Sequence, residues 1–172
     1  MKKTILGLMV MVVMFAGSCK KNSSTNAAPS ANSWTFKNTT YIPTNVWQNI
    51  NGGAGPGVLE VDDTTLAFGP SMYVYFAGHI MPTMGGTYKV VSANYDQIDF
   101  SSSTAKEIGI IFYLSGNAYY TTGGNGSNQN VTVSVSQTGK VSISGSAIEV
   151  DNLNGNSITS DSSALTLNAT QH

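Results

Sequence analysis

Hydrophobic and polar residues alternate with a period of two along many short stretches of the chain. The clearest stretch covers residues 130–136, where Val131, Val133 and Val135 alternate with threonine and serine. A period of two sends successive side chains to opposite faces of a β-strand. We therefore predict a strand here, with the three valines in the core and the hydroxyl side chains outside.

A second strand is expected to begin at Val141, after a turn over residues 137–140. Its inward positions change parity at Gly145, which is typical of a β-bulge, and Ile148 is then expected to point inward. Alternation also predicts that Tyr73 and Tyr75 share one face of a strand, opposite to Val74 and Phe76. Further runs that predict strands are residues 59–61, 65–68, 72–78, 87–91, 97–100, 108–114 and 164–169.

Helical spacing is not sustained for more than about two turns anywhere in the sequence. Closely spaced strands without intervening helices favour an antiparallel sandwich or barrel. The predicted fold is therefore all-β, a single antiparallel β-sandwich or barrel-like domain over residues 34–171. Trp34 and Phe36 at its start are expected in the core.

The first residues follow a different pattern. Lys2 and Lys3 precede an apolar run over residues 5–16, which is too short for a membrane-spanning helix of about 20 residues. Small residues then lead to Cys19, and this arrangement resembles the lipobox of bacterial lipoproteins. The resemblance implies a signal peptide over residues 1–18, a diacylglycerol thioether on Cys19 and an acylated (palmitate-type) amine.

That lipid would make a bilayer the partner of the chain, because several acyl chains hold a protein on a membrane. Residues 19–33 are small and polar and predict a flexible tether. Cys19 is the only cysteine, so no internal disulfide is possible. The 8 basic residues are all lysine, and the chain has 9 acidic residues, so it carries no excess of positive charge. This charge balance and the lack of arginine argue against a nucleic-acid partner.

The stretches SWTFKNTTY, GGTYKVV, AYYTTGGNGSNQNVTVSV, GKVSISGSAIEVDN and ALTLNATQ resemble small outer-membrane lipoproteins of the Bacteroidota. The resemblance implies a β-sandwich-type domain on a lipid anchor and brings no assigned activity. In this phylum, acidic residues after the lipidated cysteine are associated with export to the cell surface. Lys20, Lys21 and Asn22 stand there instead, which favours the periplasmic face of the outer membrane.

Residues 63–65 resemble the Asp-Ser/Thr-apolar O-glycosylation signal of the same phylum. Thr64 would be the modified residue, although Thr65 in the third position departs from the pattern. The alternative is a plain β-turn aspartate followed by two threonines.

Nucleophilic hydrolysis is not favoured, because after the leader only His79 and His172 could serve as the base and no G-x-S-x-G elbow is present. A carboxylate pair for glycoside hydrolysis stays open as an alternative, since two acids need only converge in space. The candidates are Asp96, Asp99 and Glu107, and the group Glu60, Asp62 and Asp63.

A third alternative is weak Cu(I) binding, because thioether and imidazole ligands suit that ion and His79, Met81 and Met84 lie close in sequence. The competing interpretation places Met81 in the core and His79 at a strand end. Residues 151–156 fail the EF-hand calcium pattern, with a leucine at the third position. No cofactor is predicted.

Several aromatic residues could stack on a sugar or a peptide. Trp47, Tyr119 and Tyr120 are the candidates, and the two tyrosines precede a long glycine-rich loop, where binding residues often lie. The alternative is that aromatics fill the core. The leading hypothesis is a non-catalytic cell-envelope lipoprotein that is structural or binds a glycan, a peptide or an envelope protein.

Overall fold

The computed structural model describes residues 32–49, 57–66, 69–94, 97–123, 129–152, 157–158 and 164–172. Within these residues the chain is all-β, with one short 3₁₀ helix, η1 (Ala77–His79), and no α-helix. None of the described segments is a helix long and apolar enough to cross a membrane. The strands are β1 (Ser33–Phe36), β2 (Thr39–Tyr41), β3 (Asn45–Gln48), β4 (Val58–Asp62), β5 (Ser71–Phe76), β6 (Gly86–Val90), β7 (Glu107–Leu114), β8 (Asn117–Thr121), β9 (Asn130–Val135), β10 (Val141–Ile148), β11 (Val150–Asn152), β12 (Ser157–Ile158) and β13 (Leu165–Thr170).

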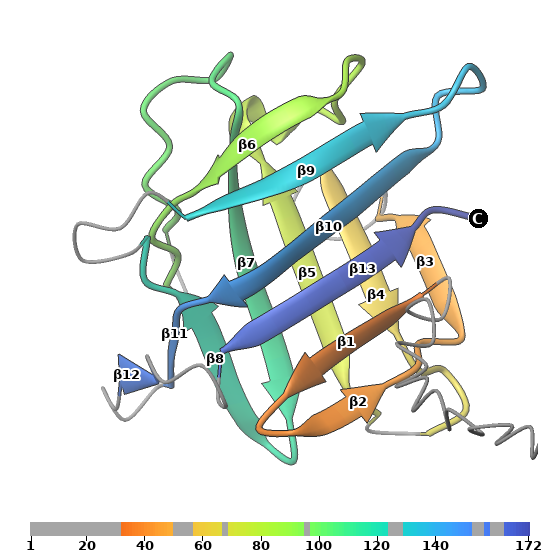
Figure 1. Ribbon diagram of the computed structural model, residues 1–172, viewed down its shortest axis with the longest axis vertical. Coiled ribbons are helices and arrows are strands. Elements are labelled where there is room, and N and C mark those ends of the chain that lie inside the picture. Colours follow the sequence, from red (N-terminus) through yellow and green to blue (C-terminus); the bar gives the residue numbers. More distant parts are fainter. Residues whose placement is uncertain are drawn as a thin grey trace, which may run out of the picture.

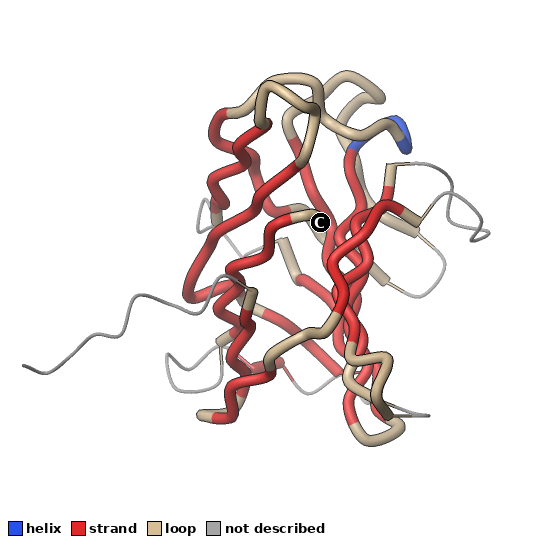
Figure 2. Tube along the Cα trace, turned by 90° about the vertical axis from the view of Figure 1, so that its right-hand side faces the viewer, coloured by secondary structure: helices blue, strands red, loops and turns tan. Residues whose placement is uncertain are grey.

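These strands form one strongly curled sheet, a half-barrel, which confirms the predicted fold class. β3, β4, β5 and β7 make a back layer, and β6, β9, β10, β13 and β1 cross in front of it (Figure 1). The side view shows the two layers facing each other (Figure 2). The sheet bends at β7, which pairs with β5 on one edge and with both β8 and β6 on the other. The β6–β7 pairing is parallel, and the other pairings between described strands are antiparallel.

The space between the layers is filled mainly by aliphatic side chains, and aromatic rings from both layers meet within it. Trp34 and Phe36 of β1 are each 1% exposed, as alternation predicts. Phe112 of β7 meets the ring of Trp34 at 5.4 Å and the ring of Phe36 at 5.0 Å. Such edge-to-face contacts add to the free energy gained by burying the rings. At the far end of the sheet, the His172 N–H donates to the Val46 carbonyl at 3.0 Å, which links the front layer to β3.

The period-two predictions hold where the strands form. Val131 and Val133 are buried and Val135 is half-buried against the core. The predicted bulge is present in β10, where the register with β13 shifts between Gly145 and Ile148.

Two of the expected strands do not form in the part of each that the structure describes, residues 65–66 and 97–100. Leu66 lies in a turn and is 58% exposed, because the Asp63 side chain accepts a hydrogen bond from the Thr65 N–H and fixes a local turn. Residues 97–100 contribute only an isolated bridge between Ile98 and Ala93.

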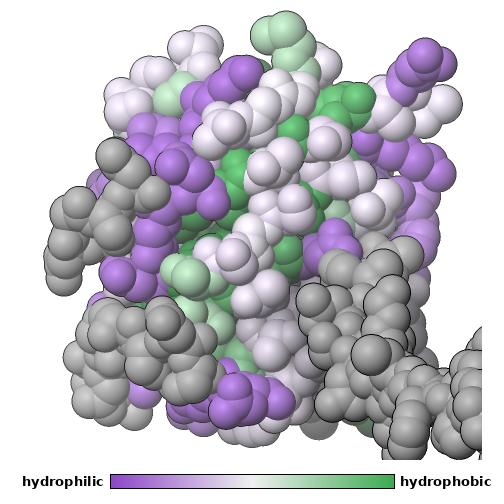
Figure 3. All heavy atoms as spheres, in the orientation of Figure 1, coloured by the Kyte–Doolittle hydropathy of each residue, from purple (hydrophilic) through white to green (hydrophobic). Residues whose placement is uncertain are grey.

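The front layer presents an outer face rich in small hydroxyl side chains. Thr132 and Ser134 of β9, Ser144 of β10 and Thr166 of β13 are exposed. Pale, weakly polar spheres cover much of this face (Figure 3). These side chains suit a solvated strand surface and offer no large ring for stacking, so the aromatic candidates must be sought on the back layer.

Candidate ligand-binding site

A row of large side chains crosses the outer face of the back layer. Trp47 of β3 lies opposite Glu60 of β4, which lies opposite Tyr73 of β5. Their chain neighbours Val46, Leu59, Val61, Met72 and Val74 point into the core. The alternation that builds the core therefore also aligns Trp47, Glu60 and Tyr73, called here the outer row, on the opposite face.

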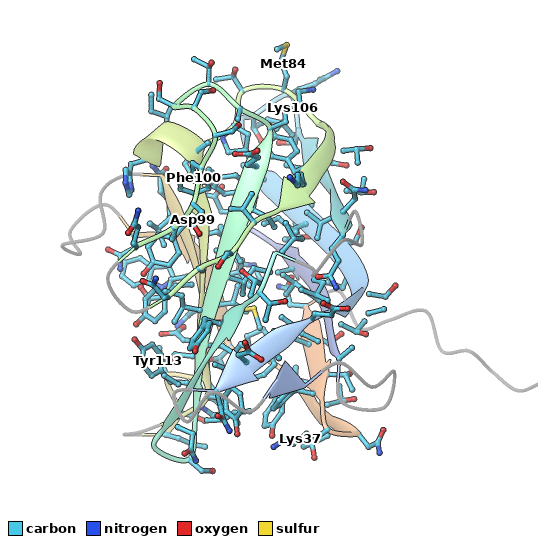
Figure 4. The ribbon with its side chains drawn as sticks, turned by 90° about the vertical axis from the view of Figure 1, so that its left-hand side faces the viewer. Lys37, Met84, Asp99, Phe100, Lys106 and Tyr113 are labelled. Atoms are coloured by element: carbon cyan, nitrogen blue, oxygen red, sulfur yellow. The ribbon has the colours of Figure 1, made fainter. Side chains whose placement is uncertain are left out.

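The outer row leads into an open depression of about 600 Å³ at the end of β4, β5 and β7. The ring of Tyr73 meets the ring of Tyr113 edge to face, with 6.1 Å between centroids. Tyr113 lies on the same outer side of the ribbon as Asp99 and Phe100 (Figure 4). The depression is lined by Glu60, Asp62, Asp63, Thr64, Leu66, Gly69, Ser71, Tyr73, Tyr113, Leu114, Ser115 and Gly116.

Glu60 is held in place at the centre of the outer row. It is 9% exposed, and its Oε2 accepts a hydrogen bond from Asn49 Nδ2 at 2.7 Å. Burial raises the pKa of the Glu60 carboxyl, and the charge of Asp62 raises it further, against the hydrogen bonds from Tyr73 and Asn49. Burial, followed by the charge of Glu60, raises the pKa of Tyr73 to about 12, so its hydroxyl keeps the proton that it donates to Glu60.

Asp62 and Asp63 extend the acidic character into the depression. Burial raises the pKa of Asp62, and the charge of Asp63 adds to the effect. Asp62 Oδ1 is shielded from solvent and has no hydrogen-bond partner in the described part of the chain. A shielded acceptor without a partner carries a desolvation cost in the folded chain.

The three predicted binding aromatics lie in different places. Trp47 is 43% exposed in the outer row. Tyr120 of β8 is half-buried opposite Ile111, on the outer side of the same layer. Tyr119 is only 7% exposed, with its ring stacked on Phe112 at 5.0 Å. Tyr119 therefore belongs to the core in this fold and takes no part in the site.

The acidic candidates separate into two groups. Glu60, Asp62 and Asp63 all line the depression. Glu107 instead accepts a hydrogen bond from the Ser101 N–H at 2.6 Å, and Asp99 is exposed in the preceding loop. The period-two pattern predicts that Tyr73 lies opposite to Val74 but not which of them points outward. The contact of Tyr113 with Tyr73 follows from strand pairing that the sequence does not display.

The copper candidates His79, Met81 and Met84 do not line the depression beside the outer row, whereas the glycosylation candidate Thr64 does. His79 is exposed in η1, while Met81 and Met84 line a separate depression that His79 does not line. The described residues contain no group of three His, Cys, Asp or Glu side chains able to hold a metal ion. Thr64 is exposed in a turn, and its hydroxyl is hydrogen-bonded to Thr44 and Asn45.

No protein-family model, curated protein or solved structure matches the chain. Function is therefore inferred from the chemistry of the outer row and its depression.

Three predictions fall on residues outside the described ones: the leader and tether up to residue 31 with Cys19, the acid Asp96, and the loop at residues 153–156.

Proposed function

We propose that the chain is a lipid-anchored cell-envelope protein whose back layer binds a glycan without chemical conversion. The observation that carries the proposal is the outer row, in which exposed Trp47 and half-buried Tyr73 flank the buried, hydrogen-bonded Glu60. The anchor is the diacylglycerol on Cys19, and the location is the periplasmic face of the outer membrane. Both rest on the lipobox and on the residues that follow it.

The chemistry of the outer row suits a sugar chain. Aromatic rings offer broad apolar faces with a polar edge, which match the faces of a sugar ring. The Tyr73 hydroxyl donates its proton to Glu60, and its oxygen can still accept a hydrogen bond from a sugar hydroxyl. Because the depression is open to solvent, it suits an extended chain better than a small enclosed molecule.

Binding is tested by affinity electrophoresis of the leaderless protein through gels that contain xylan, mannan, β-glucan or chitosan. We expect at least one polysaccharide to retard the protein, and Trp47→Ala to weaken the interaction by about tenfold, as loss of a stacked ring implies. Ile80→Ala is the matched control, because Ile80 is also an exposed large hydrophobic residue, at 65%, but lies after η1. No retardation by any of the four would contradict the proposal.

A second candidate is glycoside hydrolysis by Glu60 and Asp62. The raised pKa of Glu60 favours it, because a buried, protonated carboxyl is the usual general acid of glycosidases. The raised pKa of Asp62 opposes it, since the partner carboxylate should stay ionised. Release of reducing ends from a bound polysaccharide, lost in Glu60→Gln, would establish hydrolysis. Binding without release supports the non-catalytic role.

The anchor has its own test. Cells that express the full chain and are fed radiolabelled palmitate should incorporate the label into the wild-type protein. Cys19→Ala should remove the label, because the thioether and the acylated amine both form at that residue. Label that persists in Cys19→Ala would overturn the anchor without affecting the glycan site.

A further inference from the structure

Two large apolar side chains stand in solvent at one end of the molecule. Ile80 is 65% exposed and Met84 is 67% exposed, and both line a shallow depression of about 250 Å³. Met81 and Pro82 lie between them in the chain and line the same depression. These four residues are called here the apolar tip. Single exposed apolar residues are ordinary, but a group on one rim is typical of a surface that another apolar surface covers.

Hydrogen bonds and close packing hold the apolar tip in its exposed position. The Met84 carbonyl accepts a hydrogen bond from the Tyr88 hydroxyl at 3.1 Å, and the Gly85 carbonyl accepts one from Lys106 Nζ at 3.2 Å. A Cβ at Gly85 would lie 2.9 Å from the Val133 carbonyl oxygen, so glycine lets the segment pack closely against β9. The exposure of the apolar tip is therefore a fixed feature of the fold.

Lysines flank the apolar tip, and no acidic residue of the described chain lines its depression. Lys106 lines the depression and lies at the same end of the molecule as Met84, which points outward (Figure 4). Lys140 is exposed in the turn between β9 and β10, and Gly85 lies against the last residues of β9 before that turn. Glu107 is buried, and its carboxylate accepts a hydrogen bond from a backbone N–H. This end of the molecule therefore combines apolar side chains with positive charge.

The chain enters the domain at the same ends of the front strands. The Thr170 N–H donates to Asn32 Oδ1 at 2.6 Å, and Thr170 lies opposite Ser142 near the start of β10. Because neighbouring strands lie about 4.8 Å apart, Asn32 lies about two strand spacings from the start of β10. The C-terminal end and the β9–β10 turn lie on the same side of the molecule (Figure 1). Residues 20–31 separate Asn32 from Cys19, and a segment of this length spans at most about 40 Å.

From this arrangement we infer that the apolar tip inserts into the surface of an anionic phospholipid bilayer, as a second contact beside the acyl chains on Cys19. The inference rests on the proposed anchor for its location and goes beyond the proposed glycan binding. Ile80 and Met84 would enter the boundary between headgroups and acyl chains. The ammonium groups of Lys106 and Lys140 would meet lipid phosphates. Because the anchor already holds the domain at the membrane, a weak affinity of the tip suffices.

A second exposed apolar pair lacks the features that point to a bilayer. Ile42 is 65% exposed and Leu66 is 58% exposed, and both line a depression of about 300 Å³. Asp63 lines that depression, and no lysine of the described chain does. Lipid phosphates would repel a carboxylate there, so the charge distribution favours the apolar tip as the membrane contact.

The test measures how residues 20–172 sediment with sucrose-loaded vesicles, because this chain keeps every described strand and lacks the lipidated cysteine. The vesicles contain phosphatidylcholine alone or phosphatidylcholine mixed with phosphatidylglycerol. We expect tighter binding to the anionic vesicles. Lys140→Gln should weaken that binding by about fivefold, the effect of one lysine near an anionic surface. Lys37→Gln, at the opposite end of the molecule in Figure 4, should keep the wild-type affinity.

The apolar contribution has its own matched pair of variants. Ile80→Asp should weaken binding to the anionic vesicles by at least about tenfold, since it replaces a buried apolar contact by a charge that phosphate repels. Ile42→Asp is the control, because Ile42 and Ile80 are equally exposed at 65%, and it should keep the wild-type affinity. If Ile80→Asp does not fold by circular dichroism, Met84→Asp serves as the second variant, with the same expected loss.

Nuclear magnetic resonance of methionine ¹³C-methyl groups gives an independent measurement. With spin-labelled lipid in the vesicles, the Met84 signal should broaden. The Met72 signal should not, because Met72 is buried in the core.

The contradicting outcomes are distinct from failure of the proposed function. No binding of the wild-type chain to either kind of vesicle would overturn the inference, as would an equal loss of binding in Ile80→Asp and Ile42→Asp. Self-association in the analytical ultracentrifuge that Ile80→Asp abolishes, without vesicle binding, would assign the apolar tip to a second copy of the chain and overturn the bilayer contact. The palmitate label on Cys19 and the retardation by polysaccharides still decide the anchor and the glycan binding separately.

Discussion

Thr121 shows how a single polar residue holds the bend of the sheet. Its side chain is fully buried, and its hydroxyl donates to the Val91 carbonyl at 2.8 Å and accepts from the Ile110 N–H at 3.2 Å. The hydroxyl thereby joins β8 to β7 and to the segment after β6. Buried backbone groups need such partners, and a strand end at a bend cannot supply them all by ladder pairing.

Thr121→Val keeps the shape of this side chain and removes the hydroxyl. We expect the free energy of unfolding to fall by about 1–3 kcal/mol, because the Ile110 N–H and the Val91 carbonyl lose this partner in the interior. Urea unfolding measures the change. Thr121→Ser keeps the hydroxyl and should cost less than the valine variant, and the opposite order would contradict the assigned role of the hydrogen bonds.

Glu60 gives the folded chain a specific pH dependence. Burial raises its pKa above the ordinary 4.5, so the folded state binds a proton that the unfolded state has already released. The resulting stability is present below pH 4.5 and is lost as the pH rises through the raised pKa. Glu60→Gln should therefore show a smaller fall in unfolding free energy across this window in urea titrations. An unchanged fall would mean that Glu60 does not titrate differently in the folded chain.

Residue positions could be predicted from the sequence where alternation leaves one solution. Trp34 and Phe36 follow it into the core. Tyr119 and Tyr120 are adjacent, so alternation requires one to point inward but does not say which. Register with β7 decides, because Tyr119 lies opposite Phe112, whose side chain is inside.

At the scale of elements, the β10 bulge carries a local conformational cost. Ala147, within the bulge, has a φ of 55°, in the left-handed region that disfavours every residue with a Cβ. The parity break at Gly145 predicts the bulge, but the residue that takes the left-handed conformation depends on how β10 rejoins β13.

Ala147→Gly should raise the free energy of unfolding by about 0.5–1 kcal/mol, since glycine adopts this φ without steric cost. The urea midpoint should move upward. Ala169→Gly in β13 is the control, because Ala169 is buried in an extended strand and its loss should destabilise the chain. A lower midpoint for Ala147→Gly would contradict the assignment of strain to residue 147.

Elements were predicted less well where side chains compete with the strand ladder. The run at residues 65–68 is apolar enough for a strand, yet Asp63 caps a turn before it and Gly69-Pro70 follows it. Residues 97–100 cross the outer face of β7, where Ile98 packs over Gly109. Ile98 thus makes an apolar contact outside a regular strand, which a period count cannot distinguish from strand pairing.

At the scale of the whole molecule, the aromatic cluster couples the two layers. Phe112 of the back layer contacts Trp34 and Phe36 of the front layer and Tyr119 of β8. The order of strands, the parallel β6–β7 pairing and the curl could not be predicted, because they follow from contacts between residues distant in sequence. The outer row is a product of that pairing, so only its single members are visible in the sequence.

Phe112→Ala should destabilise the entire domain by about 3–5 kcal/mol, the usual cost of removing a buried phenylalanine. Tryptophan fluorescence, which includes buried Trp34, and far-UV circular dichroism should change together in one transition. Ile42→Ala, at a residue 65% exposed, should leave the midpoint near the wild-type value. Separate transitions for the two signals would show that the layers unfold independently.

The most direct test of the central claim is a nuclear magnetic resonance titration of the ¹⁵N-labelled domain with an oligosaccharide of the polysaccharide that retards it most. We expect shifts at the Trp47 indole N–H and at the amides of Glu60, Tyr73 and Tyr113, with the hydroxyl face of β9, β10 and β13 unchanged. Shifts confined to that hydroxyl face, or no shifts at the outer row, would contradict it.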